Sequence, residues 1–487
     1  MARYIKLYIC QHNPYQLRYT ISNMPHWFQA IIVLLIVWVT ARVIKRNMGL
    51  LKNYFIPSSI IGGVLLLLIG PQVLQIIPQD IMQPLYPLPA LLINVVFAAL
   101  FLGKAIPSAR QVWERAGPMI ALGNTIAWGM YVIGIALTLL ILGPLFGAPP
   151  IFGALLEISF TGGHGTSAGL APTFASLGYA NVTDMALGLA TFSIITAVIV
   201  GITVTNIYNR RIGRILDKAS MNVQQQRMVR NGYDLTRVTR QFEKNPLEIL
   251  RAIFLIALSI GIGWLLWQGM IWAEDTLLNG HTNLRIFAHV PLFPLAMLGG
   301  LIVQFAISKA NKTHWVNAKT IGIISSIALD LLIITAIGTM SLNTIGSNLP
   351  AFIILAAAGI AWILFAFFFF APRYFRKHWF EYGLTDVGQA MGMTATGLLL
   401  NRLVDPLNHT GARESFAYKQ LAFEPFMGGG VVTAFAVVAI VEFGQLPLLV
   451  LSLVVTAFWI VVGLLLGRQR HLRLRHQLNI GWFASHH

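Results

Sequence analysis

The sequence predicts an all-α polytopic membrane protein with two inverted-topology five-helix repeats, each containing a re-entrant hairpin, and an extra C-terminal transmembrane helix. Composition supports the membrane class, because 56% of the 487 residues are hydrophobic and only 10% are charged, whereas an ordinary soluble domain is about 25% charged. Apolar runs of about 20 residues, the length needed to cross a bilayer, recur along the chain. A glycine-rich interruption follows the fourth run of each half, which predicts the repeats.

The first repeat is expected over 27–207, after an N-terminal tail at 1–26. No short apolar segment with a small-residue cleavage site precedes Trp27, so we expect the first span to be a retained anchor. An interruption near 157–171 lies between the fourth and fifth spans. The five apolar runs predict spans at 27–43, 57–74, 87–103, 118–145 and 184–207.

A basic cytoplasmic linker at 208–246 separates the halves, and the second repeat is expected over 247–444 with an interruption near 383–401. An additional transmembrane helix at 445–467 precedes a basic cytoplasmic tail at 468–487. The chain is thus expected to cross the membrane about eleven times. The remaining spans are predicted at 247–273, 290–307, 321–340, 351–370, 421–441 and 446–466.

Lysine and arginine gather in alternate loops, which predicts the orientation in the membrane. Because basic loops stay in the cytoplasm, we expect the N-terminus outside and the C-terminus inside. The numbers of basic residues before and after the first span are nearly equal, so the orientation is predicted from the later loops. The net charge of +17 does not indicate nucleic acid, since no basic stripe with interleaved aromatics occurs. The basic loops are 104–115, the linker, 309–319, 373–377 and 468–475, whereas 72–86 and 341–350 contain no Lys or Arg.

The two interruptions form the candidate transport site. The first runs from Phe160 to Gly169 and the second from Gly383 to Gly397. Irregular backbone at membrane depth survives only where protein or a water-filled cavity satisfies its polar groups. An odd number of crossings separates the two, so the first is expected to enter from outside and the second from the cytoplasm, with the tips meeting near the midplane. The alternative is that the small residues permit close helix packing.

Hydroxyl groups in the interruptions could hold a substrate carboxylate and a cation side by side. Half-helix N-termini attract a carboxylate, and carbonyl and hydroxyl oxygens suit a hard cation. His164 could hydrogen-bond an anionic substrate, or could instead be a neutral histidine bonded to the hairpin backbone. The candidate hydroxyl side chains are Thr161, Thr166, Ser167, Thr394 and Thr396.

Three acidic residues lie in or beside apolar spans. Asp330 sits within 321–340, where a carboxylate is costly enough to favour function; it could bind sodium or carry a proton, and an interhelical hydrogen bond is the alternative. Glu157, with the Ser159 hydroxyl close by, is the second cation candidate, unless it lies near the outer surface. Glu424 precedes Pro425 and a run of glycines, and we expect it at the membrane interface.

The residues from Ser159 to Thr166 read SFTGGHGT, and GYANVT follows at 178–183 and ATF at 190–192. This pattern resembles the bacterial sodium/glutamate symporters. The resemblance extends to YFIP at 54–57 and to Gly62-Gly63, and it covers roughly 27–444.

The resemblance implies a secondary active transporter that takes glutamate into the cell by symport through the bacterial cytoplasmic (inner) membrane. It implies sodium as the coupling ion, no other cofactor, and a homodimer. By the same resemblance, the glycines of both interruptions belong to the substrate site. These are Gly162, Gly163 and Gly165, together with Gly388 and Gly392.

Other functions are compared with this one on the residues present. The second interruption has fewer glycines than the family pattern, and Glu157 and Asp330 stand where small polar residues are expected. A sodium- or proton-coupled carrier of another dicarboxylate, hydroxy-acid or amino acid is therefore the alternative. A channel is less favoured, because inverted halves suit alternating access. An enzyme is not expected, because no H-E-x-x-H, G-x-S-x-G or paired Asp-rich motif is assigned. The single cysteine, Cys10, allows neither an internal disulfide nor a cysteine metal cluster.

Overall fold

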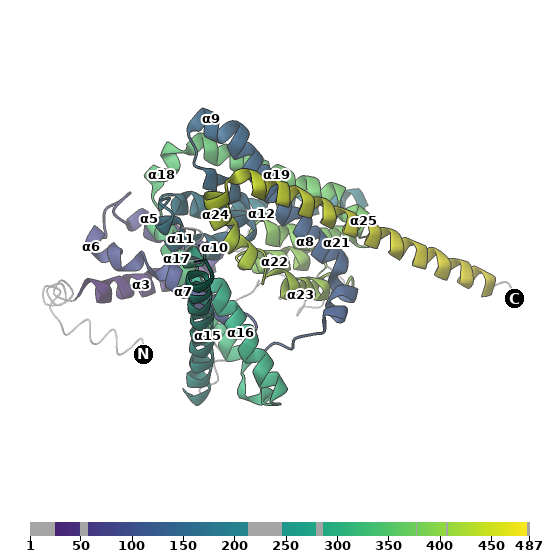
Figure 1. The fold of residues 1–487 in the computed structure, drawn as a ribbon, viewed down its shortest axis with the longest axis horizontal. Coiled ribbons are helices and arrows are strands. Elements are labelled where there is room, and N and C mark those ends of the chain that lie inside the picture. The colour runs from purple at the N-terminus through teal and green to yellow at the C-terminus, as the bar shows by residue number, and fades with distance from the viewer. Residues whose placement is uncertain are drawn as a thin grey trace.

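The computed structural model describes residues 25–48, 57–212, 246–278, 286–375, 377–405 and 408–484. These residues form helices and connections without a strand, so the predicted all-α class is confirmed for them. Nine helical segments in this part of the chain are long and apolar enough to span a membrane, at nine of the eleven predicted places. Their main helices are α3 (His26–Asn47), α7 (Leu88–Ala98), α8 (Ala109–Leu137), α12 (Val182–Ile212), α15 (Pro246–Leu278), α16 (Leu292–Lys309), α17 (Ala318–Thr339), α19 (Leu349–Phe369) and α25 (Gln445–Ala484) (Figure 1).

The other two predicted spans differ from the structure. α5 covers Ser58–Ile69 and ends before the predicted limit at 74, because Gly70 is extended and Pro71 follows it. The prediction of one span at 421–441 is wrong. The chain instead forms α23 (Ala412–Phe423), leaves helical geometry over 424–430 and resumes as α24 (Val431–Phe443). Glycines at 428 and 429, with φ of 66° and 104°, permit this third interruption.

Both predicted interruptions are mostly helical. In the first, a π-helical turn over Glu157–Thr161 leads to α10 (Gly163–Gly169) and α11 (Ala171–Ser176), and the helix is interrupted at Gly162. In the second, only 391–393 separate α21 (Trp379–Ala390) from α22 (Thr394–Val404). The predicted irregular stretches are therefore longer than the breaks in the structure. The reason is that glycine tolerates helical as well as irregular backbone.

The helices pack as three groups. α3, α5 and α17 enclose an apolar cluster that includes Leu66 and Ile334. α15 and α16 pack against each other and against α7, with Val303 buried between them. The largest core joins α8, α12, α17 and α19 and includes Tyr131 and Phe367. In Figure 1 the first group lies at the left, α15 and α16 project downward, and the largest group fills the centre and right.

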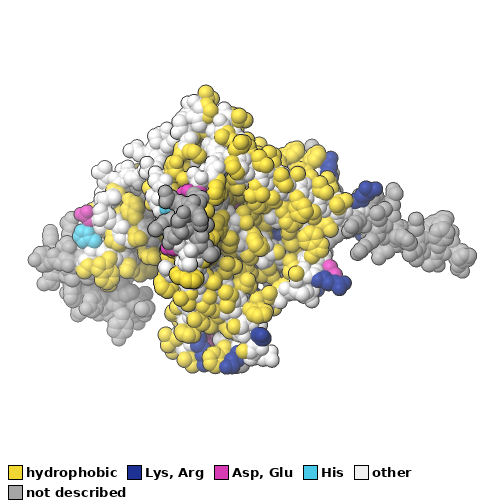
Figure 2. Space-filling model, in the orientation of Figure 1, with side chains coloured by type: hydrophobic (Ala, Val, Ile, Leu, Met, Phe, Trp, Pro, Cys, Tyr) yellow, Lys and Arg dark blue, Asp and Glu magenta, His cyan; other side chains and the backbone are white. Residues whose placement is uncertain are grey.

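The outer surface along the long helices is apolar. Figure 2 shows hydrophobic side chains over the central face and Lys and Arg side chains at its lower and right margins. Leu140 and Trp272 are 75% and 70% exposed, and apolar surface this extensive marks contact with a membrane or a partner. With the nine long helices, this surface identifies a multi-pass membrane protein.

Several predictions concern residues outside the described part of the chain. These are most of the N-terminal tail (1–24), most of the linker (213–245), the YFI sequence at 54–56 and the last residues, 485–487. The additional C-terminal helix is present as α25. It continues past the predicted end at 467 to Ala484 and packs along α8.

Candidate functional site

The tips of the two predicted interruptions lie side by side. Gly163 has a φ of 66°, and a Cβ built on it would lie 2.9 Å from the carbonyl oxygen of Gly392. The Ser193 hydroxyl of α12 donates to the carbonyl of Met391 and holds the second tip against that helix. Position 163 therefore requires glycine for two reasons, its left-handed backbone and the close approach of another chain segment.

The third interruption, 424–430, also reaches this place. The backbone N–H of Gly428 donates to Oε1 of Glu157 at 2.8 Å. The Thr166 hydroxyl lies 3.2 Å from the carbonyl oxygen of Gly428 and 3.0 Å from that of Gly162. In the sequence these glycines, Gly428, Gly429 and Gly430, stand out only as a run beside Glu424. The signal that could have found them was a proline followed by three glycines within a membrane-depth segment.

Glu157 links the first and third interruptions through its carboxylate. Besides the Gly428 N–H, it accepts hydrogen bonds from the Tyr131 hydroxyl at 2.9 Å and the Thr433 hydroxyl at 3.0 Å. The side chain is 0% exposed. All three donors are neutral. The hydrogen bonds therefore satisfy the carboxylate oxygens, but none of the three donors brings a positive charge that would compensate the carboxylate.

Two polar atoms beside Glu157 in the chain are buried without a hydrogen-bond partner in the described structure. They are the Ser159 hydroxyl oxygen and Nδ1 of His164. The other imidazole nitrogen, Nε2, lies 2.9 Å from the hydroxyl of Thr191 in α12. His164 is thus bonded to a neighbouring helix, in contrast to the backbone bond considered as an alternative. Buried polar atoms normally have partners, so these two are available to a ligand.

The other candidate residues of the first interruption have partners within the protein. The Ser167 hydroxyl donates to the carbonyl of Gly163 at 2.9 Å, and the Thr161 hydroxyl lies 3.4 Å from the sulfur of Met130. These side chains are buried. The Ser167 bond therefore stabilises the backbone of α10, and Thr161 contacts α8.

Two of the predicted glycines lie where helices pack closely. A Cβ on Gly388 would be 2.8 Å from Cα of Gly397, which places α21 against α22. A Cβ on Gly165 would be 2.8 Å from Cδ1 of Ile93 in α7. Both positions fit the packing alternative for small residues in membrane helices.

The start of α22 carries a small hydrogen-bonded network. Thr394 donates to Oε1 of Glu424 at 2.8 Å and accepts from Nε2 of Gln420 at 2.7 Å. Glu424, expected at the membrane interface, is half-buried and bonded to this helix start. Thr396, two residues further on, is buried, and its hydroxyl would be 3.0 Å from a Cβ on Gly392.

Asp330 has partners in a different part of the fold. Its Oδ2 lies 3.2 Å from the Arg42 guanidinium and 3.4 Å from Nε1 of Trp38, both in α3. α3 lies at the left of Figure 1, whereas α21, α22 and α23 lie to the right. The ion pair with Arg42 supports the alternative that Asp330 connects helices.

Asp405 fixes the end of the second broken segment. It accepts hydrogen bonds from the backbone N–H of His409 at 2.8 Å and of Thr410 at 3.0 Å. Partial burial opposes ionisation, but the bonds from Thr410 and His409 outweigh it and hold the pKa of the Asp405 carboxyl below its usual value.

Comparisons of the sequence with known proteins identify its family. The sodium/glutamate symporter family matches residues 26–379 of the chain. The chain belongs to the sodium/glutamate symporter family. It is 25% identical over 342 residues to the sodium/glutamate symporter of Escherichia coli (strain K12), an alignment that covers 67% of this chain and 76% of the relative. The sodium/glutamate symporter of Shigella flexneri matches to the same extent.

Membership of the sodium/glutamate symporter family makes the chain a transporter and excludes the enzyme class. Residues 165–169 do match the G-x-S-x-G spacing of serine hydrolases, which sequence analysis overlooked. That motif places its serine on a strand-to-helix turn. Ser167 instead lies within α10 and donates to a backbone carbonyl.

The matched region includes the first interruption but ends as α21 begins. Beyond it lies a buried ion pair that sequence analysis missed. Lys419 of α23 and Asp386 of α21 are 3.0 Å apart, and each side chain is 0% exposed. Lys419 stands just before the predicted span at 421–441, and a lysine there is normally interpreted as reaching for the interface. In the structure Lys419 lies within α23 with its side chain buried.

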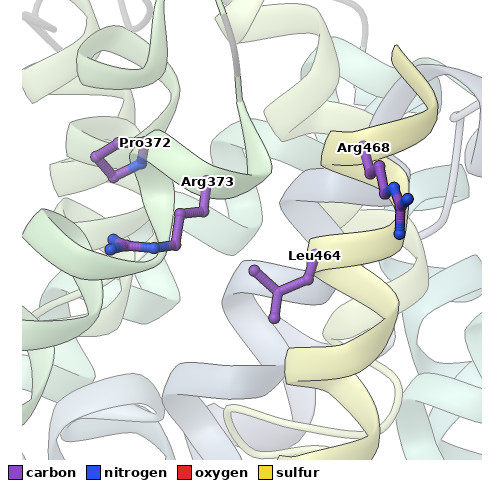
Figure 3. Close-up of a pocket in the computed structure, with 4 residues that line it drawn as sticks. All are labelled: Pro372, Arg373, Leu464 and Arg468. Carbon is purple, nitrogen blue, oxygen red and sulfur yellow. The ribbon is translucent and has the colours of Figure 1, made fainter. Parts of the chain in front are cut away.

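An open pocket lies elsewhere on the molecule. It has a volume of about 550 Å³ and is lined by Pro372, Arg373, Leu464 and Arg468 at the ends of α20 (Ala371–Tyr374) and of the apolar part of α25. Figure 3 shows the Arg373 guanidinium pointing away from Leu464. None of these four lining residues belongs to the candidate site.

Proposed function

We propose that the protein carries glutamate into the cell by sodium-coupled symport across the cytoplasmic membrane. Family membership over residues 26–379 supports the reaction class. The observation that carries the assignment of the site is the meeting of three interrupted segments at Glu157, a buried carboxylate held by neutral donors. A functional role is the default for an intramembrane acid of this kind.

Sodium binds at Glu157 in this proposal. The carboxylate supplies charge, and the Ser159 hydroxyl, which has no hydrogen-bond partner in the described structure, is a further oxygen ligand. Hard cations favour such oxygen ligands. The bound ion would compensate the charge of Glu157, which otherwise repels an anionic substrate.

Glutamate binds next to the ion, between the first and second interruptions. Nδ1 of His164 is buried and without a hydrogen-bond partner in the described residues, so it can meet a substrate group. The N-terminus of α22 has no side-chain cap, and its free N–H groups attract a carboxylate. Thr394 and Thr396 stand at that helix start. The other candidates of the first interruption, Thr161 and Ser167, shape the backbone around it.

Coupling follows from charge. Sodium binds first, orders the tips of the interruptions and strengthens glutamate binding, and linkage makes the effect reciprocal. A conformational change then exposes the site to the cytoplasm, where sodium and glutamate are released. The interruptions are suited to this step, because a broken helix has ends that can shift relative to each other.

Contacts at the ends of the broken segments support re-entrant hairpins of inverted topology. The first segment begins where Gln445 donates to the carbonyl of Pro150 at 2.6 Å and ends where Thr173 donates to the carbonyl of His289 at 2.8 Å. The charge rule puts these loops outside. After the second segment, Ser415 donates to the carbonyl of Arg115 at 3.0 Å, in a basic loop that the rule puts in the cytoplasm. The N-terminus is then outside, the C-terminus inside, and a homodimer is proposed by analogy with related carriers.

Uptake of labelled glutamate into proteoliposomes tests the proposal. We expect accumulation with an inward sodium gradient and none with an equal potassium gradient. Unlabelled aspartate and citrate serve as competitors that define the substrate class. Absence of sodium-driven glutamate uptake in vesicles that retain folded protein would overturn the assignment.

A proton-coupled carrier of another dicarboxylate, hydroxy-acid or amino acid is the second candidate. The observation that favours it is Glu157 itself, because a carboxylate bonded to neutral groups can carry a proton in place of sodium. Uptake of citrate or another acid driven by a proton gradient alone would support this candidate.

A further inference from the structure

Lys419 lies in an enclosed set of cation ligands. Its Nζ is 3.0 Å from Oδ1 of Asp386 and 2.7 Å from Oε1 of Gln389. The ring of Phe423 lies on another side, with its centroid 3.8 Å from Nζ. The ammonium group thus has a carboxylate oxygen, an amide oxygen and an aromatic face as neighbours, which are favourable contacts for a monovalent cation.

The surroundings close this site and leave one oxygen spare. A Cβ on Gly123 of α8 would lie 2.5 Å from Cε and 3.0 Å from Nζ of Lys419, so α8 covers the ammonium directly. Oδ2 of Asp386 is buried and has no hydrogen-bond partner in the described part of the chain. The oxygens present could therefore serve a cation with more ligands than an ammonium uses.

The position of the pair connects it with the interruptions. Asp386 lies on α21, which leads to the break at 391–393, and Lys419 lies on α23, which leads to the break at 424–430. The next residue, Gln420, bonds Thr394 at the start of α22. The ion pair therefore joins the two helices that lead to the second and third interruptions.

We propose that Asp386 and Gln389 form a monovalent cation site that the Lys419 ammonium fills, and that sodium binds there when the lysine side chain is removed. A buried carboxylate needs a compensating charge, and removal of its partner is strongly unfavourable. In the native protein the tethered ammonium supplies that charge, so this half of the protein takes no sodium from solution. The native chain thus binds one sodium ion fewer than the Lys419→Ala variant.

Equilibrium measurements on the purified full-length protein test the proposal. Thermal stability of wild type, Lys419→Ala and Asp386→Asn/Lys419→Ala is measured in detergent over a range of NaCl, with choline chloride holding the ionic strength constant. We expect Lys419→Ala to be less stable than wild type in choline and to regain stability as sodium saturates. The double variant should lack this extra response, because the carboxylate is gone. Lys309→Ala, at an exposed position at the end of α16, is the matched control and should behave as wild type.

Binding of radioactive sodium gives the second readout. Lys419→Ala should bind one more ion per chain than wild type, and the double variant should not. A folded Lys419→Ala with the sodium response of wild type would overturn the proposal. So would a variant that stays unfolded at every sodium concentration, because sodium is required to replace the ammonium. Neither measurement involves glutamate. A failure of this proposal can therefore be distinguished from a failure of the proposed transport function.

Discussion

The two predicted interruptions each bury an acidic side chain just before the glycine at the tip, but they satisfy it differently. Glu157 receives three neutral hydrogen bonds, whereas Asp386 faces the ammonium of Lys419. Both side chains are fully buried. The buried pair of the second interruption is therefore neutral by itself, while the first interruption retains a carboxylate that an external cation can compensate. In the proposed mechanism, the first half is therefore the one that binds the coupling ion.

Replacing Lys419 by methionine should have the largest effect on stability. Methionine fills similar space but leaves Asp386 without its partner, and breaking a buried pair costs about 3–5 kcal/mol. We expect a large fall in the free energy of unfolding, measured by thermal or denaturant unfolding in detergent. The Asp386→Asn/Lys419→Met double variant should lose less than the single variant, since the uncompensated charge is removed. Equal losses of unfolding free energy in the single and double variants would show that Lys419 does not compensate the charge of Asp386, and the contrast between the two halves would be wrong.

Glu157→Gln should remove the sodium response of transport. Glutamine retains an oxygen acceptor for part of the hydrogen-bond network but has no charge to offer a cation. We expect sodium-driven uptake to fall roughly 100-fold, or about 3 kcal/mol, the scale of a buried charge that loses its partner. Initial rates against sodium concentration give the measurement. Glu114→Gln, at an exposed position on α8, is the control, and equal sodium dependence in both variants would contradict the role of Glu157.

Gly163→Val should abolish uptake while membrane insertion persists. The left-handed φ costs a non-glycine residue about 1–3 kcal/mol, and the new side chain would collide with the carbonyl of Gly392. Gly178→Val is a matched control, because Gly178 has a φ of 87° but open space around its Cβ position. Similar uptake in the two variants would show that the contact between the tips does not matter.

Asp330→Asn should have the smallest effect. Its ion pair with Arg42 connects α17 to α3, and interhelical polar contacts contribute about 1 kcal/mol or less. We expect slightly lower thermal stability and an unchanged sodium dependence of uptake. A sodium affinity that drops as far as in Glu157→Gln would restore Asp330 as a cation ligand.

Hydropathy and glycine clusters predicted the helical class, nine of the long helices among eleven expected spans, and the places of two interruptions, because apolar length and glycine clusters are local properties of the chain. They did not predict that the third interruption at 424–430 reaches Glu157, since that contact joins residues far apart in sequence. The burial of Lys419 was not predicted for a related reason. A lysine near the end of an apolar run gives the same sequence signal whether it reaches toward water or pairs inside.

Charged residues illustrate the same limit. Asp330 and Glu157 both appear in sequence as acids near or within apolar segments, and only the fold supplies Arg42 to one and neutral donors to the other. The close approach of Gly388 to Gly397, which packs α21 against α22, is likewise a contact that only the fold reveals.

The most direct test of the account is the affinity of the purified protein for glutamate as a function of sodium concentration, compared between wild type and Glu157→Gln. The account predicts that sodium tightens glutamate binding to wild type and that glutamate tightens sodium binding by the same factor. The variant should show neither effect. Glutamate affinity that is independent of sodium in wild type, or equally dependent on sodium in both proteins, would contradict it.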